Sequence, residues 1–306
     1  MLKFSDDVIA ALESGAPVVA LESTIISHGL PRPRNLEVAR ELEAAVRDGG
    51  AVPATIAVLD GVPRVGLDDK ELERVAHDEQ MRKLGHRDLP VALATGASGA
   101  TTVSATAFLA ARAGLRFFAT GGLGGVHRGW TAEQDESADL RLLAETRITV
   151  VCAGVKSILD VAATLQRLET LGVTVVGYRT GEFPGFYLSR SGQPVDWTVG
   201  TPEEVSAVMA AQDDLCGPPA AIVVANPVPE EEQLDPELHD RVLAQALAAA
   251  EQEGVTGQAV TPFLLGRLVE GTAGASLEAN LAAVRGNVRL AARLAVAWSE
   301  RGTHHT

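Results

Sequence analysis

Apolar runs rich in β-branched residues alternate along this chain with segments of helical periodicity, and this alternation constrains the fold more than any other feature. The runs lie at 18–24, 52–67, 89–95, 115–122, 148–154, 173–180 and 220–227. Several are apolar throughout, which is typical of strands that helices cover on both faces. We therefore predict a three-layer α/β/α sandwich with a mixed, mostly parallel sheet, formed as a single domain over residues 1–306.

Turn and cap signals predict further elements. Asp60-Gly61 separates two β-rich runs and is typical of a hairpin, so part of the sheet should be antiparallel. Apolar residues at helical spacing predict a helix over 156–171, and a cap at Ser276 predicts a long final helix. The Pro- and Glu-rich stretch 226–237 is expected to form a loop rather than a domain linker.

Composition excludes some functional classes. A net charge of −14 argues against a general nucleic-acid-binding protein, although a few local cations could still hold an anionic small ligand. The only cysteines, Cys152 and Cys216, fit a reducing cytosol better than a disulfide framework. The uncharged stretch 89–111 is interrupted by Pro90, and the first residues resemble no export signal, so we expect a cytoplasmic protein without a membrane partner.

Lys156 is conspicuous because only four of the 26 basic residues are lysines, and this one follows a buried strand through Gly154. We expect it to begin a helix, where the macrodipole and burial both disfavour an ammonium group. A neutral amine can form a Schiff base with a carbonyl, whereas arginine cannot. A lysine that reaches solvent or pairs with Asp160 explains the position equally well.

Other polar residues also follow predicted strands, where ligands gather in open α/β sheets. Among them are Glu22 and His127, although such a histidine is more often structural. The hydroxyl-rich helix start 101–104 and the glycine loop 121–125 could each hold an anion through backbone amides. Helix capping and tight turns are the commoner roles of such segments, and the loop does not match the GxGxxG pattern.

A compact acidic segment at 135–139 suits a hard divalent cation. It places Asp135, Ser137 and Asp139 within one turn. Carboxylates with water are typical ligands of Mg²⁺ or Mn²⁺, which commonly also contact phosphate. The helix macrodipole alone also favours acidic residues at a helix start, and without other information that is the better interpretation.

Taken together, these stretches resemble one family, the pseudouridine-5'-phosphate glycosidases, also called indigoidine synthase A-like proteins. The similarity covers about residues 15–295 and rests on long motifs in the family's order, among them "ALESTIISHGLPRPRN", "GATTVSAT", "ATGGLGGVHRG", "VVCAGVKSILD", "GEFPGFY" and "TPFLLGRLVEGTAGASLEANLA". The resemblance implies reversible cleavage of the C–C glycosidic bond of pseudouridine 5'-phosphate to uracil and ribose 5-phosphate. Such a bond has no leaving-group oxygen to protonate, so an iminium on a lysine supplies the electron sink.

The resemblance also assigns roles to residues of this chain. It makes Lys156 the nucleophile, which forms a Schiff base with the ring-opened sugar, and Glu22 the proton donor to the departing uracil carbon. Asp135 matches the family's divalent-metal ligand, with Mn²⁺ the usual ion. It places Lys83 near the phosphate, gives Val103 a backbone contact with substrate and puts Asn280 at the uracil edge. The other substrate-binding positions that it implies are Thr120, His127, Ser137, Ala138 and Asp139. A homotrimer is also implied.

Three places depart from the family's pattern, namely Ala97-Ser98, Gly181 and Gly286, and they leave substrate preference open. Two other functions therefore stay in view. One is a Schiff-base lyase of another sugar phosphate, and the other is a non-catalytic phosphosugar sensor. Glu22 together with Lys156 argues against the sensor, because binding alone needs neither an acid nor a reactive amine.

Overall fold

The computed structural model describes residues 1–130 and 134–303, and one large sheet runs through them. The strands follow the order β1-β4-β3-β2-β7-β8-β11-β9-β10, with β6 attached to β3 and β5 attached to β6. Their bounds are β1 Lys3–Phe4, β2 Val18–Leu21, β3 Val52–Leu59, β4 Val62–Val65, β5 Arg82–Leu84, β6 Gly99–Thr101, β7 Phe117–Ala119, β8 Thr149–Cys152, β9 Thr174–Tyr178, β10 Thr198–Val199 and β11 Ile222–Ala225.

Most strand pairs are parallel, as the sequence predicted. In the centre, Val151 of β8 pairs with Ala119 of β7 on one side and with Val224 of β11 on the other. Among the described strands, the antiparallel pairs are β3 with β4 and β3 with β6. The predicted hairpin joins β3 to β4, and Asp60 and Gly61 adopt the left-handed φ values of 50° and 72° that its tight turn requires.

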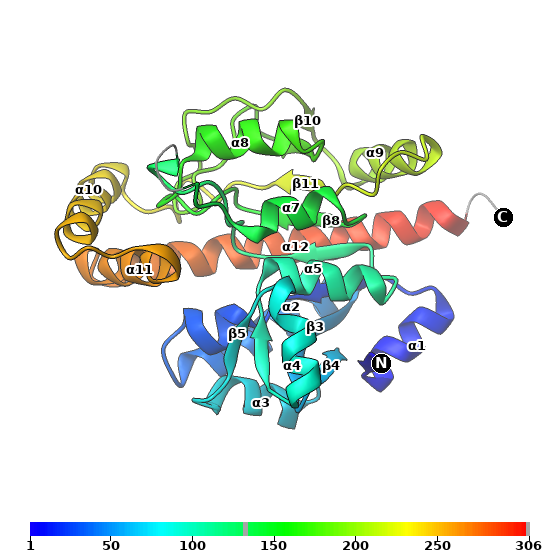
Figure 1. The fold of residues 1–306 in the computed structure, drawn as a ribbon. Helices are drawn as coiled ribbons and strands as arrows, with labels where there is room; N and C mark the ends of the chain where they lie inside the picture. The colour runs from blue at the N-terminus through cyan, green and yellow to red at the C-terminus, as the bar shows by residue number, and fades with distance from the viewer. Residues whose placement is uncertain (131–133, 304–306) are drawn as a thin grey trace.

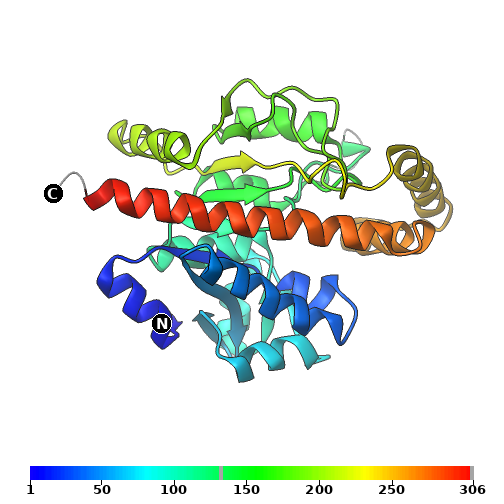
Figure 2. The same ribbon diagram turned by 180° about the vertical axis from the view of Figure 1, so that it is seen from behind.

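Helices cover both faces of the sheet, which confirms the three-layer sandwich (Figures 1 and 2). One face packs against α2, α9 and α12, and the other packs against α1, α5, α7 and α8. The helices are α1 Asp6–Ser14, α2 Arg34–Asp48, α3 Asp69–His77, α4 Leu89–Thr95, α5 Val103–Arg112, α7 Ala138–Ala144, α8 Val161–Thr170, α9 Pro202–Asp214, α10 Pro236–Gln252, α11 Val260–Gly271 and α12 Ala275–Thr303.

The central strands are apolar throughout because both of their faces are buried. In β7, Phe118 belongs to the core under α5 and α7, whereas its neighbour Phe117 belongs to the core under α12. Every residue of β8 and of β11 is buried. This double burial explains why these runs show no polar face in the sequence.

The run 89–95 is a helix, α4, and our prediction of a strand there was wrong. Pro90 occupies the first turn, where its missing N–H costs nothing, and Gly96 ends the helix in the left-handed conformation. Only Leu89 and Ala92 are buried, at a spacing of a helix turn. Such a short apolar run fits strand and helix periodicity equally well, so the flanking Pro and Gly carried the signal.

Two predicted helix starts also shift. The helix expected over 156–171 begins only at Val161, after Asp160, whose carboxylate accepts from the Ala163 N–H at 3.0 Å. Lys156 therefore lies in a turn before the helix, and the macrodipole argument does not apply to it. The final helix begins at Ala275, one residue before the predicted Ser276 cap.

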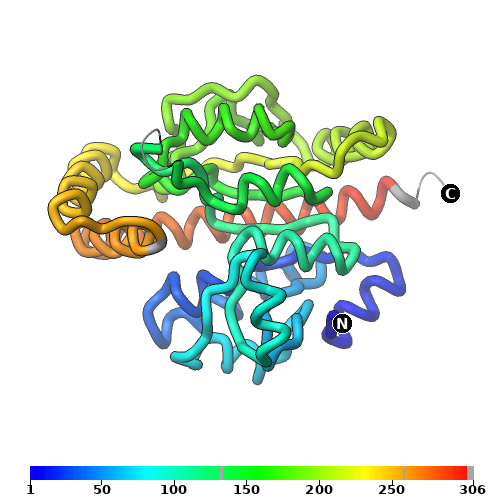
Figure 3. The backbone as a smooth tube through the Cα atoms, in the orientation of Figure 1, coloured from blue at the N-terminus to red at the C-terminus, as the bar shows by residue number. Residues whose placement is uncertain are grey.

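The C-terminal part of the chain wraps around the sandwich. Helices α10 and α11 stand together at one end of the molecule, and α12 then crosses the whole width to the opposite end (Figure 3). The predicted loop at 226–237 leads from β11 to α10, which begins at its Pro236. Within residues 1–130 and 134–303, no helix is both long enough and apolar enough to cross a membrane.

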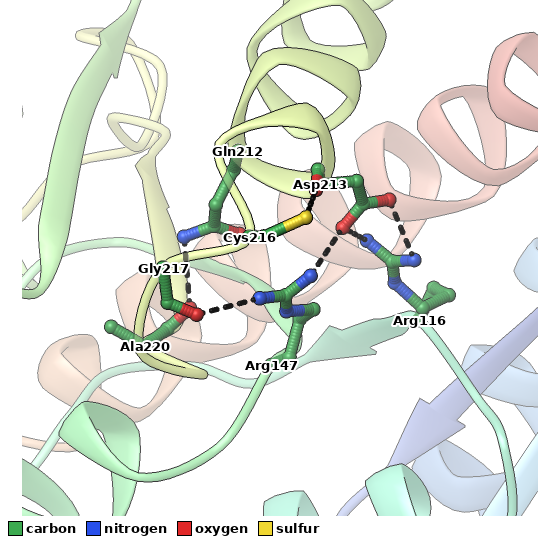
Figure 4. A network of polar contacts seen from close by, with 7 residues as sticks. All are labelled: Arg116, Arg147, Gln212, Asp213, Cys216, Gly217 and Ala220. Atoms are coloured by element: carbon green, nitrogen blue, oxygen red, sulfur yellow. Dashed lines mark hydrogen bonds and ion pairs between the residues drawn. The ribbon is translucent and has the colours of Figure 1, made fainter.

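A charged network ties the amino ends of the central strands to α9. Asp213, near the end of α9, accepts hydrogen bonds from Arg116, just before β7, and from Arg147, just before β8, at 3.1 Å each (Figure 4). Arg147 also donates to the Gly217 carbonyl at 3.0 Å. The network leaves the carboxyl ends of the same strands free for other groups.

Candidate active site

The carboxyl ends of the central strands bring the predicted catalytic residues together. Glu22 directly follows β2, Thr120 directly follows β7, and Lys156 lies shortly beyond the end of β8. Because β2, β7 and β8 are consecutive parallel neighbours, their carboxyl ends meet at one edge of the sheet. Lys83 approaches the same place from β5, since its charge and that of Lys156 both act on the Glu22 carboxyl.

Glu22 has the properties of a proton donor. Burial raises the pKa of its carboxyl above the ordinary value, and the nearby charge of Asp139 acts in the same direction. The positive charge of Lys156 and a hydrogen bond from the Thr120 hydroxyl only partly offset the effect of burial. A carboxylic acid that keeps its proton toward neutral pH is suited to general acid catalysis.

The pKa of Lys83 is lowered, whereas that of Glu22 is raised. Burial lowers the pKa of its ammonium group, and the positive charge of Lys156 lowers it further, whereas Glu22 and Asp139 raise it. Two lysines and two carboxylates thus share one electrostatic environment. Clusters of titratable groups whose pKa values are shifted by burial and by one another are typical of functional sites.

Asp139 is held firmly by the backbone. Its carboxylate is buried and accepts from the N–H groups of Ser104 and Gly124, each at 2.9 Å. These amides belong to the segments 101–104 and 121–125, for which the sequence allowed anion binding beside the commoner roles of helix capping and tight turns. In the structure the anion that both amides bind is the Asp139 carboxylate, which fixes its negative charge close to Lys83.

The glycine loop 121–125 packs tightly on the start of α7. Ser137 caps this helix, and its hydroxyl accepts from the Asp139 N–H at 3.2 Å. A Cβ on Gly124 would overlap the Ser137 hydroxyl, so this glycine permits close approach rather than an unusual φ. Ala138 is exposed in the first turn of α7, next to Asp139.

Three other predicted substrate-binding residues lie around the same edge. The Asn280 Oδ1 of α12 would be 3.0 Å from a Cβ on Gly121, the residue after Thr120. The Val103 side chain is buried in the core, so a contact with substrate would have to come from its backbone. The Thr120 hydroxyl donates to the Glu22 carboxylate, so in the structure its partner is the predicted proton donor.

The predicted metal ligand Asp135 lies beside His127. The Asp135 Oδ2 is 3.9 Å from the His127 Nδ1, and the His127 N–H donates to the Asp135 carbonyl at 3.0 Å. In the part of the chain that the structure describes, no group of three or more His, Cys, Asp or Glu side chains is arranged to hold a metal ion. One carboxylate and one imidazole suit an ion such as Mn²⁺ that takes its other ligands from water or phosphate.

Cys152 at the end of β8 is not a competing nucleophile. Burial raises the pKa of its thiol to about 12, so the thiolate is scarce at neutral pH. The other cysteine, Cys216, is exposed and lies at the far end of the strands, beside Asp213. The reactive groups of the site are therefore the lysines and the carboxylates.

The sequence analysis missed the role of Asn287 in α12. This fully buried side chain donates to the carbonyl oxygens of Thr120 at 2.7 Å and of Gly121 at 3.3 Å, and it accepts from the Asn226 side chain at 3.0 Å. It thereby fixes the segment that supplies the hydrogen bond to Glu22. The one available signal was an amide side chain on the apolar face of a helix, where buried polar groups need partners.

The departures from the family's pattern lie outside this cluster of charged groups. The Ser98 hydroxyl accepts from the Asp60 N–H at 2.8 Å, at the turn of the β3–β4 hairpin. A Cβ on Gly181 would meet nothing within 4 Å, and one on Gly286 would lie 3.5 Å from the Asn226 amide nitrogen. Position 286 thus borders the Asn287 network without replacing any of its members.

Comparison with known proteins agrees with this geometry. Residues 7–297 match the family model described as indigoidine synthase A like protein. The chain is 74% identical to a pseudouridine-5'-phosphate glycosidase of Streptomyces griseus subsp. griseus, over 97% of this chain and 92% of the relative. A relative of the same name from Frankia alni is 63% identical, over 95% of this chain and 80% of the relative.

Two solved structures share the fold. The prealnumycin C-glycosynthase AlnA, in complex with ribulose 5-phosphate, superposes with a TM-score of 0.93 at 37% identity and covers 99% of both chains. An indigoidine synthase A-like protein from Thermotoga maritima gives a TM-score of 0.88 at 38% identity, over 98% of this chain and 97% of its own. From its sequence, its fold and the composition of its site, this chain belongs to the indigoidine synthase A like family.

Proposed function

We propose that this protein is a pseudouridine-5'-phosphate glycosidase, which reversibly converts pseudouridine 5'-phosphate and water to uracil and ribose 5-phosphate. The observation that carries the proposal is the pairing of Lys156 with Glu22, a carboxyl whose pKa is raised by burial, at the carboxyl ends of β8 and β2. Relatives that are 74% and 63% identical bear this name. The activity belongs to nucleotide catabolism.

The reaction follows from the chemistry of these two side chains. The Lys156 amine attacks C1′ of the sugar, the bond from C1′ to the ring oxygen breaks, and that oxygen takes up a proton. The bond from C1′ to uracil C5 then breaks toward uracil, and Glu22 delivers its proton to C5. The electron pair of the Lys156 nitrogen forms the iminium at C1′, and water releases ribose 5-phosphate and restores the amine.

Other residues bind the substrate in this proposal. Lys83 supplies positive charge for the phosphate, and Asn280 contacts uracil, with Thr120, His127, Val103 and 137–139 around them. Asp135, with His127 beside it, would hold Mn²⁺, which when bound neutralises phosphate charge. Asp139 is held by two backbone N–H groups, which fix the position of its carboxylate beside the cluster.

We also propose the setting in which the enzyme works. The whole chain, residues 1–306, acts as one domain, because the site draws on segments from Glu22 to Asn287. A homotrimer in the cytoplasm is expected from the family resemblance, and light scattering of the purified protein tests the trimer. A lyase of another sugar phosphate keeps one specific support, since AlnA, named as a C-glycosynthase, was solved with ribulose 5-phosphate.

Reduction of the imine tests the proposal. The enzyme is incubated with ribose 5-phosphate and borohydride, and the peptides are analysed by mass spectrometry. We expect one sugar-phosphate adduct on the peptide with Lys156, and none in Lys156→Arg, which keeps the charge but cannot form an imine. The same preparation should release uracil from pseudouridine 5'-phosphate and should leave unphosphorylated pseudouridine nearly untouched.

Four results would contradict the proposal. An adduct on Lys83 would show that Lys83, and not Lys156, is the nucleophile. Substantial turnover by Lys156→Arg would show that the reaction does not pass through an imine on Lys156. Equal turnover of the unphosphorylated nucleoside would overturn the phosphate assignment. Release of a base other than uracil from another sugar phosphate, without action on pseudouridine 5'-phosphate, would favour the lyase of a different substrate.

A further inference from the structure

A buried hydrogen bond connects α10 to the turn that carries Lys156. The Ser157 Oγ lies 2.8 Å from the Nε2 of His239, although 82 residues separate them in the chain. The other ring nitrogen, Nδ1, lies 2.9 Å from the Asp240 Oδ1. Because a carboxylate only accepts, the Nδ1–H of the neutral ring donates to Asp240, which leaves Nε2 to accept the Ser157 hydroxyl.

The order of these groups is that of a nucleophilic Ser-His-Asp triad, but their burial argues against that role. A nucleophilic serine must be open to substrate, whereas the carboxylate of such a triad is buried. Here Ser157 and His239 retain only 5% and 4% of their exposure, while the Asp240 side chain is 78% exposed. The hydroxyl is thus closed to substrate, and the hydrogen bond instead fixes the position of Ser157.

The position of Ser157 matters because the segment around Lys156 has no helix to support it. Helix α8 begins only at Val161, so the turn depends on contacts with other parts of the chain. The Lys156 N–H donates to the Leu123 carbonyl at 3.2 Å, and the Arg128 guanidinium donates to the Ser157 carbonyl at 3.2 Å. These bonds hold the backbone, whereas His239 holds the side chain next to the nucleophile.

We propose that His239 is a positioning residue, which sets the orientation of Lys156 through Ser157 and couples the α10–α11 pair to imine formation. This inference rests on the proposed function, in which Lys156 is the nucleophile. Helices α10 and α11 stand at one end of the molecule, beside the start of α12 (Figure 1). His239 lies in the first turn of α10, and its ring holds the turn of Lys156 through the Ser157 hydroxyl.

The test compares the rate of imine formation in two substitutions of the same residue. His239→Leu keeps an apolar body of similar size but removes the acceptor, whereas the amide oxygen of His239→Gln can still accept from Ser157. The rate of borohydride trapping with ribose 5-phosphate is measured in single turnover, alongside kcat, KM and the melting temperature. Displacement of a nucleophile by about 1 Å costs up to a hundredfold, so we expect His239→Leu to trap 10- to 100-fold more slowly with little change in KM.

A control and a double substitution separate positioning from mere stability. Val242→Ala removes buried packing from the same helix and keeps both partners of the hydrogen bond between Ser157 and His239. It should therefore lower the melting temperature while the trapping rate stays near that of the unaltered enzyme. Ser157→Ala, His239→Leu and the double variant should all slow trapping by about the same factor, because they break one hydrogen bond.

The outcomes distinguish this inference from the proposed function. If the unaltered enzyme forms no adduct at Lys156, the proposed function fails. If it forms the adduct, and His239→Leu traps as fast as His239→Gln, the positioning role of His239 is refuted. Additive effects of Ser157→Ala and His239→Leu would also refute it, since independent losses exclude a shared bond.

Discussion

Replacement of Thr120 by valine should move the pH dependence of catalysis in a defined direction. The Thr120 hydroxyl donates to the Glu22 carboxylate inside a buried site, and this bond lowers the pKa of Glu22 against the effect of burial. Valine has nearly the same shape and removes only the hydroxyl. The backbone bonds of residue 120, from its N–H to the Val151 carbonyl and from Asn287 to its carbonyl, are unaffected by the change.

The magnitude follows from the strength of the bond that is lost. A hydrogen bond to a charged group contributes about 1.5–3 kcal/mol, and 1.36 kcal/mol corresponds to one pKa unit. The bond stabilises the ionised form of Glu22, so its loss raises the pKa of this carboxyl further. In Thr120→Val the protonated form of Glu22 therefore persists to higher pH. In the proposed mechanism this is the form that delivers a proton to uracil.

The assay is the pH profile of kcat/KM for release of uracil from pseudouridine 5'-phosphate. We expect the alkaline limb to move upward by about 1–2 pH units, with a lower plateau because a weaker acid transfers its proton less readily. Thr120→Ser keeps the hydroxyl and should leave the limb near its original position. A limb that stays fixed or moves downward in Thr120→Val would refute the assignment of Glu22 as the titrating acid.

Three further predictions follow from the same contacts. Glu22→Gln should lose turnover by about 10²-fold or more, yet should still form the borohydride adduct, because sugar capture and proton delivery are separate steps. Asp213→Asn should leave Arg116 and Arg147 without a carboxylate and lower the free energy of unfolding by about 1 kcal/mol, measured by denaturant titration, with kcat/KM unchanged. Asp135→Ala should lose most activity and should respond little to added chelator, whereas the unaltered enzyme should lose activity when chelator is added. Full activity of the unaltered enzyme in excess chelator would show that the reaction needs no metal ion.

The sequence predicted the parts of the fold that depend on burial over a whole strand. Runs such as 148–154 are apolar on both faces, so their place in a parallel sheet follows directly, and with it the placement of Glu22 and Lys156 at carboxyl ends. The strand predicted at 89–95 was wrong because so short an apolar run fits either periodicity. There, Pro90 and Gly96 were the better guides, since each restricts the backbone whatever the periodicity.

The supporting contacts could not be predicted, because they join segments that are distant in the chain. His239 lies 82 residues from Ser157, and Asn287 lies 167 residues from Thr120. A buried polar side chain signals that it needs a partner, but the sequence does not say which one. The turn that carries Lys156 was wrongly predicted to be helix. Its buried apolar residues continue the helical spacing of the apolar residues in α8, so the sequence shows no break between the turn and the helix.

The arrangement of charges suggests why Glu22 and Lys156 lie so close together. A positive charge on the Lys156 nitrogen lowers the pKa of Glu22, whereas burial raises it. In the proposed mechanism the Lys156 nitrogen carries no positive charge while it attacks the sugar, so it does not offset the effect of burial and the pKa of Glu22 stays raised. Once the bond to uracil begins to break, positive charge develops on the same nitrogen as the iminium forms. The pKa of Glu22 then falls, so the acid becomes stronger at the step in which uracil C5 needs a proton. The timing of proton delivery is therefore set by the reaction itself, and a substitution that moved Lys156 away from Glu22 should impair bond cleavage more than sugar capture.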